Sequence, residues 1–206
     1  MGIYSDYIFP HLLELATQGL TEERKSLLEG VRGNVLEIGS GAGQNFPFFS
    51  SNVDQAVGLE PSPLSRKKAS QTIERIQAEV NLSVVDGVAE KLPWDDGEFD
   101  AVISFLVLCS VQDADQALRE INRVLKKGGK LFCFEHVLAN DAKVAKWQER
   151  INPFWKIIGC GCHLNRDTAS NIEAAGFELT ELQTYRSTKM GPPISSYVIK
   201  GYATKV

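Results

Sequence analysis

The sequence predicts an α/β fold with a mostly parallel sheet and helices on both of its faces. Short apolar runs alternate with helical patterns along most of the 206 residues, which is typical of repeated strand–helix–strand units. The first apolar run leads into a glycine-rich loop, and such sheets bind ligands beyond the carboxyl ends of their strands. The last two runs are only a few residues apart, too close for a crossover helix, so these strands should pair or lie antiparallel.

Composition and charge are those of one ordinary globular domain, covering 1–206. Hydrophobic residues make up 43% and charged residues 23%, and the net charge of −4 disfavours a nucleic-acid partner because phosphate binding requires a basic face. No stretch approaches the roughly 18 apolar residues of a membrane span. The four cysteines contain no C-x-x-C pair. We therefore expect a reduced, cytoplasmic protein without a transmembrane segment, and the sequence makes no prediction of its oligomeric state.

Two helices are expected before the first strand. Leu12, Leu13 and neighbouring apolar residues share one face of a predicted amphipathic helix over about 3–18. A second, short helix starts at Thr21 and ends before two glycines. Residues 1–33 are thus predicted to form an N-terminal helical cap.

Seven runs are the predicted strands. Five have the length of buried strands and two alternate in polarity; they are 34–38, 56–60, 82–86, 99–105, 130–136, 177–186 and 195–205. Helical patterns separate several of them, at 63–80 and at 113–127. The second of these begins at Asp113, a suitable N-cap, and stops at Gly128. Residues 139–176 predict a long helix, a Gly/Cys-rich loop and a second helix from Asp167 to Ala175.

The loop after the first strand places glycines at three alternate positions, Gly39, Gly41 and Gly43. Glycine permits positive φ angles and lets a ligand approach the backbone closely. The dinucleotide fingerprint G-x-G-x-x-G/A would need a small residue where this chain has Gln44. The loop therefore favours S-adenosylmethionine, which has no pyrophosphate, over a dinucleotide.

Two carboxylates end the next two strands. Glu60 can accept hydrogen bonds from both hydroxyls of a ribose, a feature shared with NAD enzymes, or it can be a solvated carboxylate at a strand end. Asp86 can accept a hydrogen bond from an adenine amino group, and the backbone N–H groups of Val88 and Ala89 can contact the ring nitrogens. These residues predict a nucleoside-binding edge of the sheet.

Four segments carry a resemblance to a known family: LEIGSGAGQN, GLEPS, DGVAEKLPWDDGEFDAVIS and REINRVLKKGGKLFCFEH. In order and spacing they resemble the motifs of class I S-adenosylmethionine-dependent methyltransferases with a type 11 domain, over about 34–136. The resemblance implies a Rossmann-like seven-stranded sheet with an antiparallel last strand, and S-adenosyl-L-homocysteine as product. Phe105 and Leu106 should face the methionine end of the cofactor. The expected cofactor contacts are Gly39, Gly41, Gly43, Glu60, Pro61, Asp86, Gly87, Val88, Ala89, Phe105 and Leu106.

A narrower resemblance extends over most of the chain. The segments FLVLCSVQ, NPFWKIIGCGCHLNRDT and GYATK are similar to those of the methyltransferase-like alkyl thiol methyltransferases. This implies an apolar thiol acceptor, with 139–176 as a helical insertion near the acceptor site. The family usually has Asn-Leu-Thr-Arg after its Gly-Cys pair, whereas this chain has His163-Leu164-Asn165-Arg166. The change lies in the loop that is expected to face the acceptor.

Other functions stay open at this point. Type 11 domains also serve lipid, quinone and other small-molecule N-, O- or C-methyl transfer, and a cofactor-binding protein without turnover is a non-enzyme alternative. Nucleic-acid methylation is disfavoured by the acidic balance and because the fourth strand ends in Ser104-Phe105-Leu106-Val107 rather than an N-P-P-[YF] tetrapeptide.

His136, at the end of the fifth predicted strand, is the candidate catalytic base. An imidazole exchanges protons near neutral pH. The alternative is a histidine that only shapes the pocket through a hydrogen bond. A thiol acceptor needs little help, since a free thiol with a pKa of about 8.5 is already a few per cent thiolate at neutral pH. His163 is expected in a surface loop, and His11 on the N-terminal helix.

Cys160 and Cys162 form a C-x-C sequence next to His163, without a recognisable fourth ligand. A zinc site normally has four ligands, so the sequence predicts no metal site. The two cysteines either line the acceptor pocket or belong to a small-residue loop. Trp155 can wall that pocket, and a helix bearing Tyr4 and Tyr7 can cover the cofactor as a lid.

Overall fold

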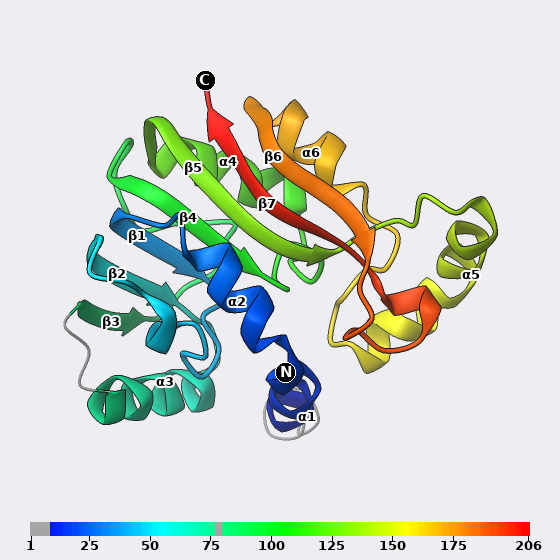
Figure 1. Cartoon of the computed structure of the whole chain (residues 1–206), viewed down its shortest axis with the longest axis horizontal. Coiled ribbons are helices and arrows are strands. Elements are labelled where there is room, and N and C mark those ends of the chain that lie inside the picture. The colour runs from blue at the N-terminus through cyan, green and yellow to red at the C-terminus, as the bar shows by residue number, and fades with distance from the viewer. Residues whose placement is uncertain (1–8, 77–79) are drawn as a thin grey trace.

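The computed structural model describes residues 9–76 and 80–206, except for the side chains at 9, 10, 14 and 16. Tyr4 and Tyr7, the expected lid residues, lie outside this part of the chain. The described residues form a sheet with the strand order β3-β2-β1-β4-β5-β7-β6 (Figure 1). The strands are β1 (Gly33–Ile38), β2 (Val53–Leu59), β3 (Asn81–Val85), β4 (Phe99–Phe105), β5 (Leu125–His136), β6 (Phe177–Arg186) and β7 (Tyr197–Lys205).

The last strand is the antiparallel one, as expected. β7 lies between β5 and β6 and runs antiparallel to both, whereas β1 to β5 pair in parallel. A short connection of 187–196 joins β6 to β7, which explains why these two strands pair directly. The seven-stranded, mostly parallel Rossmann-like sheet is therefore confirmed.

Helices cover both faces of the sheet. They are α1 (Phe9–Thr17), α2 (Thr21–Leu28), α3 (Pro63–Ile76), α4 (Ala114–Val124), α5 (Ala142–Ile158) and α6 (Thr168–Ala174). Figure 1 shows α2 in front of the sheet and α4 and α6 behind it. Among the described residues, no helix is long and apolar enough to span a membrane.

The apolar runs are continuous because both faces are buried. Val35 of β1 belongs to the core cluster under α2, with Leu28, while the next residue, Leu36, belongs to the cluster under α4, with Leu118 and Ile121. Successive side chains of a strand point to opposite faces, so a sheet covered on both sides needs apolar residues at consecutive positions.

The helix predicted for 113–127 is shorter than expected. Asp113 is its N-cap, accepting a hydrogen bond from the Gln116 backbone N–H at 2.9 Å. The helix ends at Val124, because Leu125 already pairs with Phe99 as the first residue of β5. The expected stop at Gly128 lies inside that strand.

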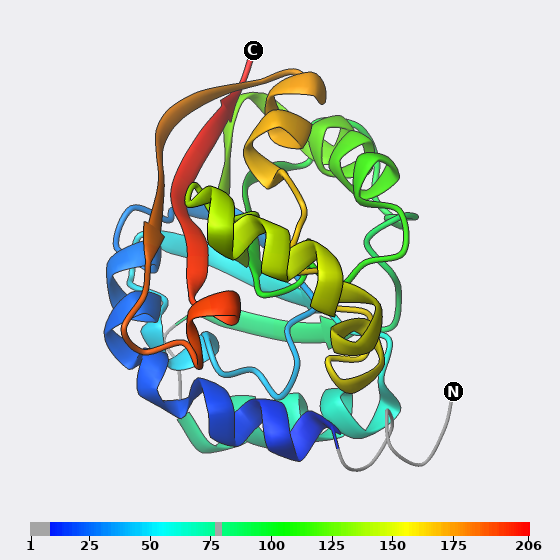
Figure 2. The same cartoon turned by 90° about the vertical axis from the view of Figure 1, so that its right-hand side faces the viewer.

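The segment 139–176 has the expected helix–loop–helix order. Asp141 caps α5 by accepting hydrogen bonds from the backbone N–H groups of Lys143 and Val144. Gln148 is fully buried and bonds the backbone of Val137 and Ala139, which fixes α5 to the chain after β5. Figures 1 and 2 place α5 beyond the carboxyl ends of the parallel strands, where ligands of such sheets bind.

Candidate active site

A cavity of about 810 Å³ lies beyond the carboxyl ends of the central strands. Its size suits a cofactor or another small molecule. Most of the expected cofactor contacts line it, namely Gly39, Gly41, Glu60, Pro61, Gly87, Val88, Ala89, Phe105 and Leu106. Leu13 and Thr17 also line it, so α1 forms part of its wall. The described part of the N-terminal segment thus reaches the cavity through Leu13 and Thr17.

The glycine loop needs its glycines for different reasons. Gly39 and Gly41 have φ angles of +57° and +55°. A Cβ on Gly39 would lie 2.5 Å from Val107, whereas a Cβ on Gly41 would meet none of the described residues within 4 Å. Gly43 does not line the main cavity, and a Cβ there would lie 2.6 Å from the Phe46 ring. Gly41 therefore faces open space in the cavity, and Gly43 serves packing.

Glu60 holds this loop to the end of β2. Its two carboxylate oxygens accept hydrogen bonds from the backbone N–H groups of Gly41 and Ser62, each at 2.9 Å. Burial raises the pKa of Glu60. A carboxylate has about four acceptor positions, so two backbone bonds leave room for a ligand's hydroxyl groups.

Asp86, unlike its neighbours Gly87 and Val88, does not line the cavity. Its side chain is 72% exposed, and it accepts a hydrogen bond from Arg66 at 2.7 Å. The same guanidinium donates to the Glu60 carbonyl oxygen. The structure thus brings the backbone after β3 to the cavity without the Asp86 carboxylate, and an adenine contact by Asp86 stays a prediction.

Glu37 is a cavity residue that the sequence analysis missed. It is 3% exposed, and its Oε1 accepts a hydrogen bond from Asn45 at 2.7 Å. Its Oε2 is buried and has no hydrogen-bond partner among the described residues. Burial raises the pKa of Glu37 to about 8. A buried carboxylate oxygen of this kind requires a donor or a cation, so Glu37 is suited to an ammonium group of a ligand.

Arg24 completes this polar group from α2. It donates to Asn45 at 2.9 Å and lies over the Phe105 ring, with its guanidinium carbon 4.2 Å from the ring centroid. Burial lowers the pKa of Arg24.

Glu37 could have been found in the sequence, because it is a charged residue inside the apolar run NVLEI. Arg24 and Asn45 give no such signal.

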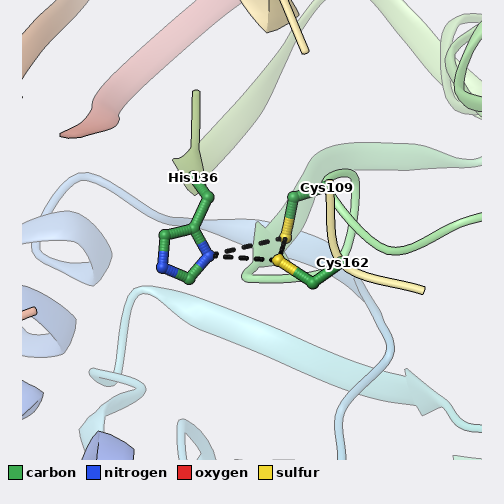
Figure 3. Close-up of side chains that lie close together, drawn as sticks. All are labelled: Cys109, His136 and Cys162. Atoms are coloured by element: carbon green, nitrogen blue, oxygen red, sulfur yellow. Dashed lines mark hydrogen bonds between the residues drawn. The ribbon is translucent and has the colours of Figure 1, made fainter. Parts of the chain in front are cut away.

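A second group of polar side chains lies where β4 and β5 end. Figure 3 shows Cys109, His136 and Cys162 pointing toward one another. The His136 Nδ1 lies 3.5 Å from the Cys162 sulfur and 3.9 Å from the Cys109 sulfur, and the sulfurs are 3.6 Å apart. We call these three residues the Cys–His–Cys cluster. Both cysteines are buried and His136 is half-buried.

The C-x-C sequence is divided between two places. Cys160 lines the main cavity, whereas Cys162 belongs to the Cys–His–Cys cluster. Cys109 comes from the loop between β4 and α4, His136 ends β5, and Cys162 lies in the loop between α5 and α6. Because the three residues of the cluster are 26 or more residues apart in sequence, no local sequence motif indicates it.

The two thiols of the cluster differ in acidity. The pKa of Cys109 is raised well above its usual value, first by its hydrogen bond with Cys162 and then by burial. The pKa of Cys162 is lowered, because the Cys109 hydrogen bond stabilises its anion.

The other candidate side chains lie outside both groups. The His163 Nδ1 lies 3.5 Å from the Asn152 amide nitrogen, and burial, with Arg166 and Lys156 nearby, lowers the pKa of His163 to about 4. His11 is exposed and lies 3.1 Å from Lys68. Trp155 is half-buried and does not line the main cavity in the described part of the chain.

The chain shares its fold with Rossmann-like methyltransferases of known structure. The structure of the YcgJ protein from Bacillus subtilis superimposes with a TM-score of 0.67, at 24% identity over 82% of this chain and 70% of that one. A family model for a methyltransferase domain matches residues 36–133.

The curated proteins that match at the level of sequence include two thiol S-methyltransferases. The chain is 31% identical to thiol S-methyltransferase TMT1B of Rattus norvegicus, over 96% of this chain and 86% of that protein. It is also 31% identical to human thiol S-methyltransferase TMT1A, over 84% of this chain and 70% of that protein. The chain is therefore an S-adenosylmethionine-dependent methyltransferase of class I with a type 11 domain, and it belongs to the family that includes these two proteins.

Proposed function

We propose that this protein transfers the methyl group of S-adenosylmethionine to a small apolar thiol. The observation that carries this proposal is that Glu60, Glu37 and the glycine loop line one cavity. In this proposal the Glu60 carboxylate accepts hydrogen bonds from the ribose hydroxyls, and the Glu37 carboxylate binds the ammonium group of the same cofactor molecule. The sequence relatives named as thiol S-methyltransferases support a thiol as acceptor.

The cavity fits this cofactor along its length. Val88, Ala89, Phe105 and Leu106 all line the cavity. In this proposal, Val88 and Ala89 contact the adenine, and Phe105 and Leu106 contact the methionine portion. The Oε2 of Glu37 has no hydrogen-bond partner among the described residues, and a bound ammonium group would supply it with a charged donor. When bound, S-adenosylmethionine supplies an activated methyl group, so the protein mainly has to orient the acceptor and exclude water.

The acceptor is expected to enter beside α5. Cys160 and Ser110 line the cavity on this side. Phe154 and Ile157, shortly before Cys160, are 70% and 74% exposed. Exposed apolar side chains on α5, three and six residues before Cys160, favour an apolar acceptor over a charged one.

His136 is our candidate for taking the proton of the acceptor. It is half-buried at the end of β5, and its Nδ1 faces the two cysteines of the cluster. A thiol acceptor places a small demand on this base, since part of the thiol is already ionised at neutral pH.

All four cysteines lie in the described part of the chain and none forms a disulfide, which supports a reducing compartment such as the cytoplasm.

Radiolabelled S-adenosylmethionine and a panel of alkyl thiols, amines and phenols test the proposal. We expect transfer to alkyl thiols and none to the other classes, with Glu37→Gln as a control that lowers transfer by weakening cofactor binding. Transfer to amines or phenols without transfer to any thiol would refute the thiol assignment. Calorimetric binding of S-adenosylhomocysteine without transfer to any acceptor would instead indicate a binding protein.

A further inference from the structure

The three atoms of the Cys–His–Cys cluster have the spacing of metal ligands. A tetrahedral zinc ion bonds sulfur at about 2.3 Å and nitrogen at about 2.0–2.1 Å, which separates two sulfurs by about 3.8 Å and sulfur from nitrogen by about 3.6 Å. The corresponding distances here are 3.6 Å between the sulfurs, and 3.5 and 3.9 Å from sulfur to the His136 Nδ1. The atoms thus outline one face of a coordination tetrahedron within a few tenths of an ångström.

We propose that Cys109, His136 and Cys162 bind one zinc ion. Two thiolates and an imidazole are ligands that zinc accepts readily, whereas magnesium and calcium require oxygen. This assignment reverses the expectation from the C-x-C sequence, which considered Cys160 and His163 as the neighbours of Cys162. The fold supplies different partners, from the ends of β4 and β5.

The backbone around the cluster is fixed by hydrogen bonds. Glu135 is fully buried, and its carboxylate accepts from the backbone N–H groups of Val107 at 2.8 Å and Cys109 at 3.0 Å. The His163 backbone N–H donates to the Cys109 carbonyl oxygen at 2.7 Å, which joins the loop bearing Cys162 to the loop bearing Cys109. The ligand atoms are therefore held together by backbone contacts, as in a preformed site.

The proposed site has three protein ligands and one open position. Among the described residues, the group of potential ligand atoms within 4.8 Å of one another contains only these three side chains. The neighbouring Glu135 carboxylate already accepts bonds from Ser104, Val107 and Cys109. Three protein ligands with a fourth position for water or substrate are typical of catalytic zinc, whereas structural zinc has four protein ligands.

If the proposed function holds, the open coordination position is where the acceptor thiol would bind. Ser110, adjacent to Cys109, and Cys160, two residues from Cys162, both line the main cavity. An acceptor thiol reaching the metal would lose its proton to solvent and bind as a thiolate. Its sulfur would then form the new bond to the methyl carbon while the sulfonium–methyl bond breaks and its electron pair stays on the cofactor sulfur. With zinc bound, His136 would be a ligand through Nδ1, and this role would replace the role as base that the metal-free protein would require.

Metal binding can be tested without an acceptor. We expect the full chain, stripped by a chelator and dialysed against Zn²⁺ under reducing conditions, to bind one equivalent by elemental analysis. With Co²⁺ it should show the absorption of a tetrahedral thiolate site. Cys109→Ala, His136→Ala and Cys162→Ala should each weaken Zn²⁺ binding by more than about 100-fold, the upper end of what losing a mere supporting residue costs.

Cys160→Ala is the matched control and should keep one equivalent of zinc. The affinity of each variant for S-adenosylhomocysteine, measured by calorimetry, shows whether the cofactor site is still folded. The proposal is overturned if the wild-type chain takes up no stoichiometric zinc, or if Cys160→Ala loses zinc as readily as Cys162→Ala. An unchanged cobalt spectrum after addition of butanethiol would overturn the open fourth position. None of these measurements requires methyl transfer. A failure of the zinc proposal can therefore be distinguished from a failure of the proposed thiol acceptor.

Discussion

Glu60 accepts a hydrogen bond from the backbone N–H of Gly41 at 2.9 Å, and this bond joins the glycine loop after β1 to the end of β2. One carboxylate therefore both shapes the loop and lines the cavity beside it. A substitution at Glu60 should accordingly affect cofactor binding in two ways, by removing an acceptor and by loosening the loop.

Glu60→Ala should weaken S-adenosylhomocysteine binding by about 1–3 kcal/mol, the usual contribution of hydrogen bonds to a charged group. Isothermal calorimetry measures this directly. Asp86→Ala is the informative companion, because its exposed carboxylate lies outside the cavity and should matter less. An equal loss in both variants would return Asp86 to the adenine site, and unchanged affinity in Glu60→Ala would remove Glu60 from the ribose site.

Glu37 predicts a pH dependence of stability in the ligand-free protein. Its pKa is raised by burial from 4.5 to about 8. As pH rises through 4.5, the unfolded chain releases this proton while the folded chain keeps it, so Glu37 makes the free energy of unfolding fall progressively up to about pH 8. Denaturant unfolding at several pH values should show this component in the wild type and not in Glu37→Gln.

Glu37→Gln should also weaken ligand binding, although it removes the pH-dependent loss of stability. Glu37→Gln removes the charge expected to face the cofactor ammonium, so S-adenosylhomocysteine affinity should fall by about 1–3 kcal/mol. A variant that binds this ligand as tightly as the wild type would show that the ammonium group lies elsewhere.

His136→Ala should reduce turnover far more than cofactor affinity, whether His136 acts as base or as metal ligand. We expect kcat to fall by about 100-fold or more, the range of a missing acid–base group, with the S-adenosylhomocysteine Kd changed less than threefold. His163→Ala is the matched control, because its ring lies outside the Cys–His–Cys cluster. Equal turnover in the wild type and His136→Ala would leave His136 with a structural role only.

Gly39→Ala and Gly41→Ala separate backbone strain from steric clash. Both residues have φ angles near +56°, a conformation that costs a residue with a side chain about 1–2 kcal/mol. A Cβ on Gly39 would also lie 2.5 Å from Val107, whereas one on Gly41 would enter open space in the cavity. We therefore expect Gly39→Ala to lower the free energy of unfolding more than Gly41→Ala does. Gly41→Ala should mainly lower the affinity for the cofactor. The reverse order would contradict the assignment of Gly41 to the cavity wall.

The sequence by itself determined the strands, most helices and the class of cofactor. These follow from local properties: the length of apolar runs, helical periodicity, and the spacing of glycines after the first strand. Even the antiparallel last strand was predictable, because the connection before it is too short for a crossover. The error at the end of α4 arose where a non-local pairing, Phe99 with Leu125, took precedence over a local stop signal.

Only the tertiary structure decided which side chains face one another. The Asp86 carboxylate is exposed and bonded to Arg66, 20 residues earlier, instead of lining the cavity. Glu37 accepts a hydrogen bond from Asn45, which in turn accepts one from Arg24. Arg24 and Asn45 lie on a helix and in a loop, and nothing in their local sequence predicts that they meet Glu37. The Cys–His–Cys cluster exists only because β4 and β5 are adjacent and the α5–α6 loop packs across their ends, and such contacts depend on chain folding over long separations rather than on any local pattern.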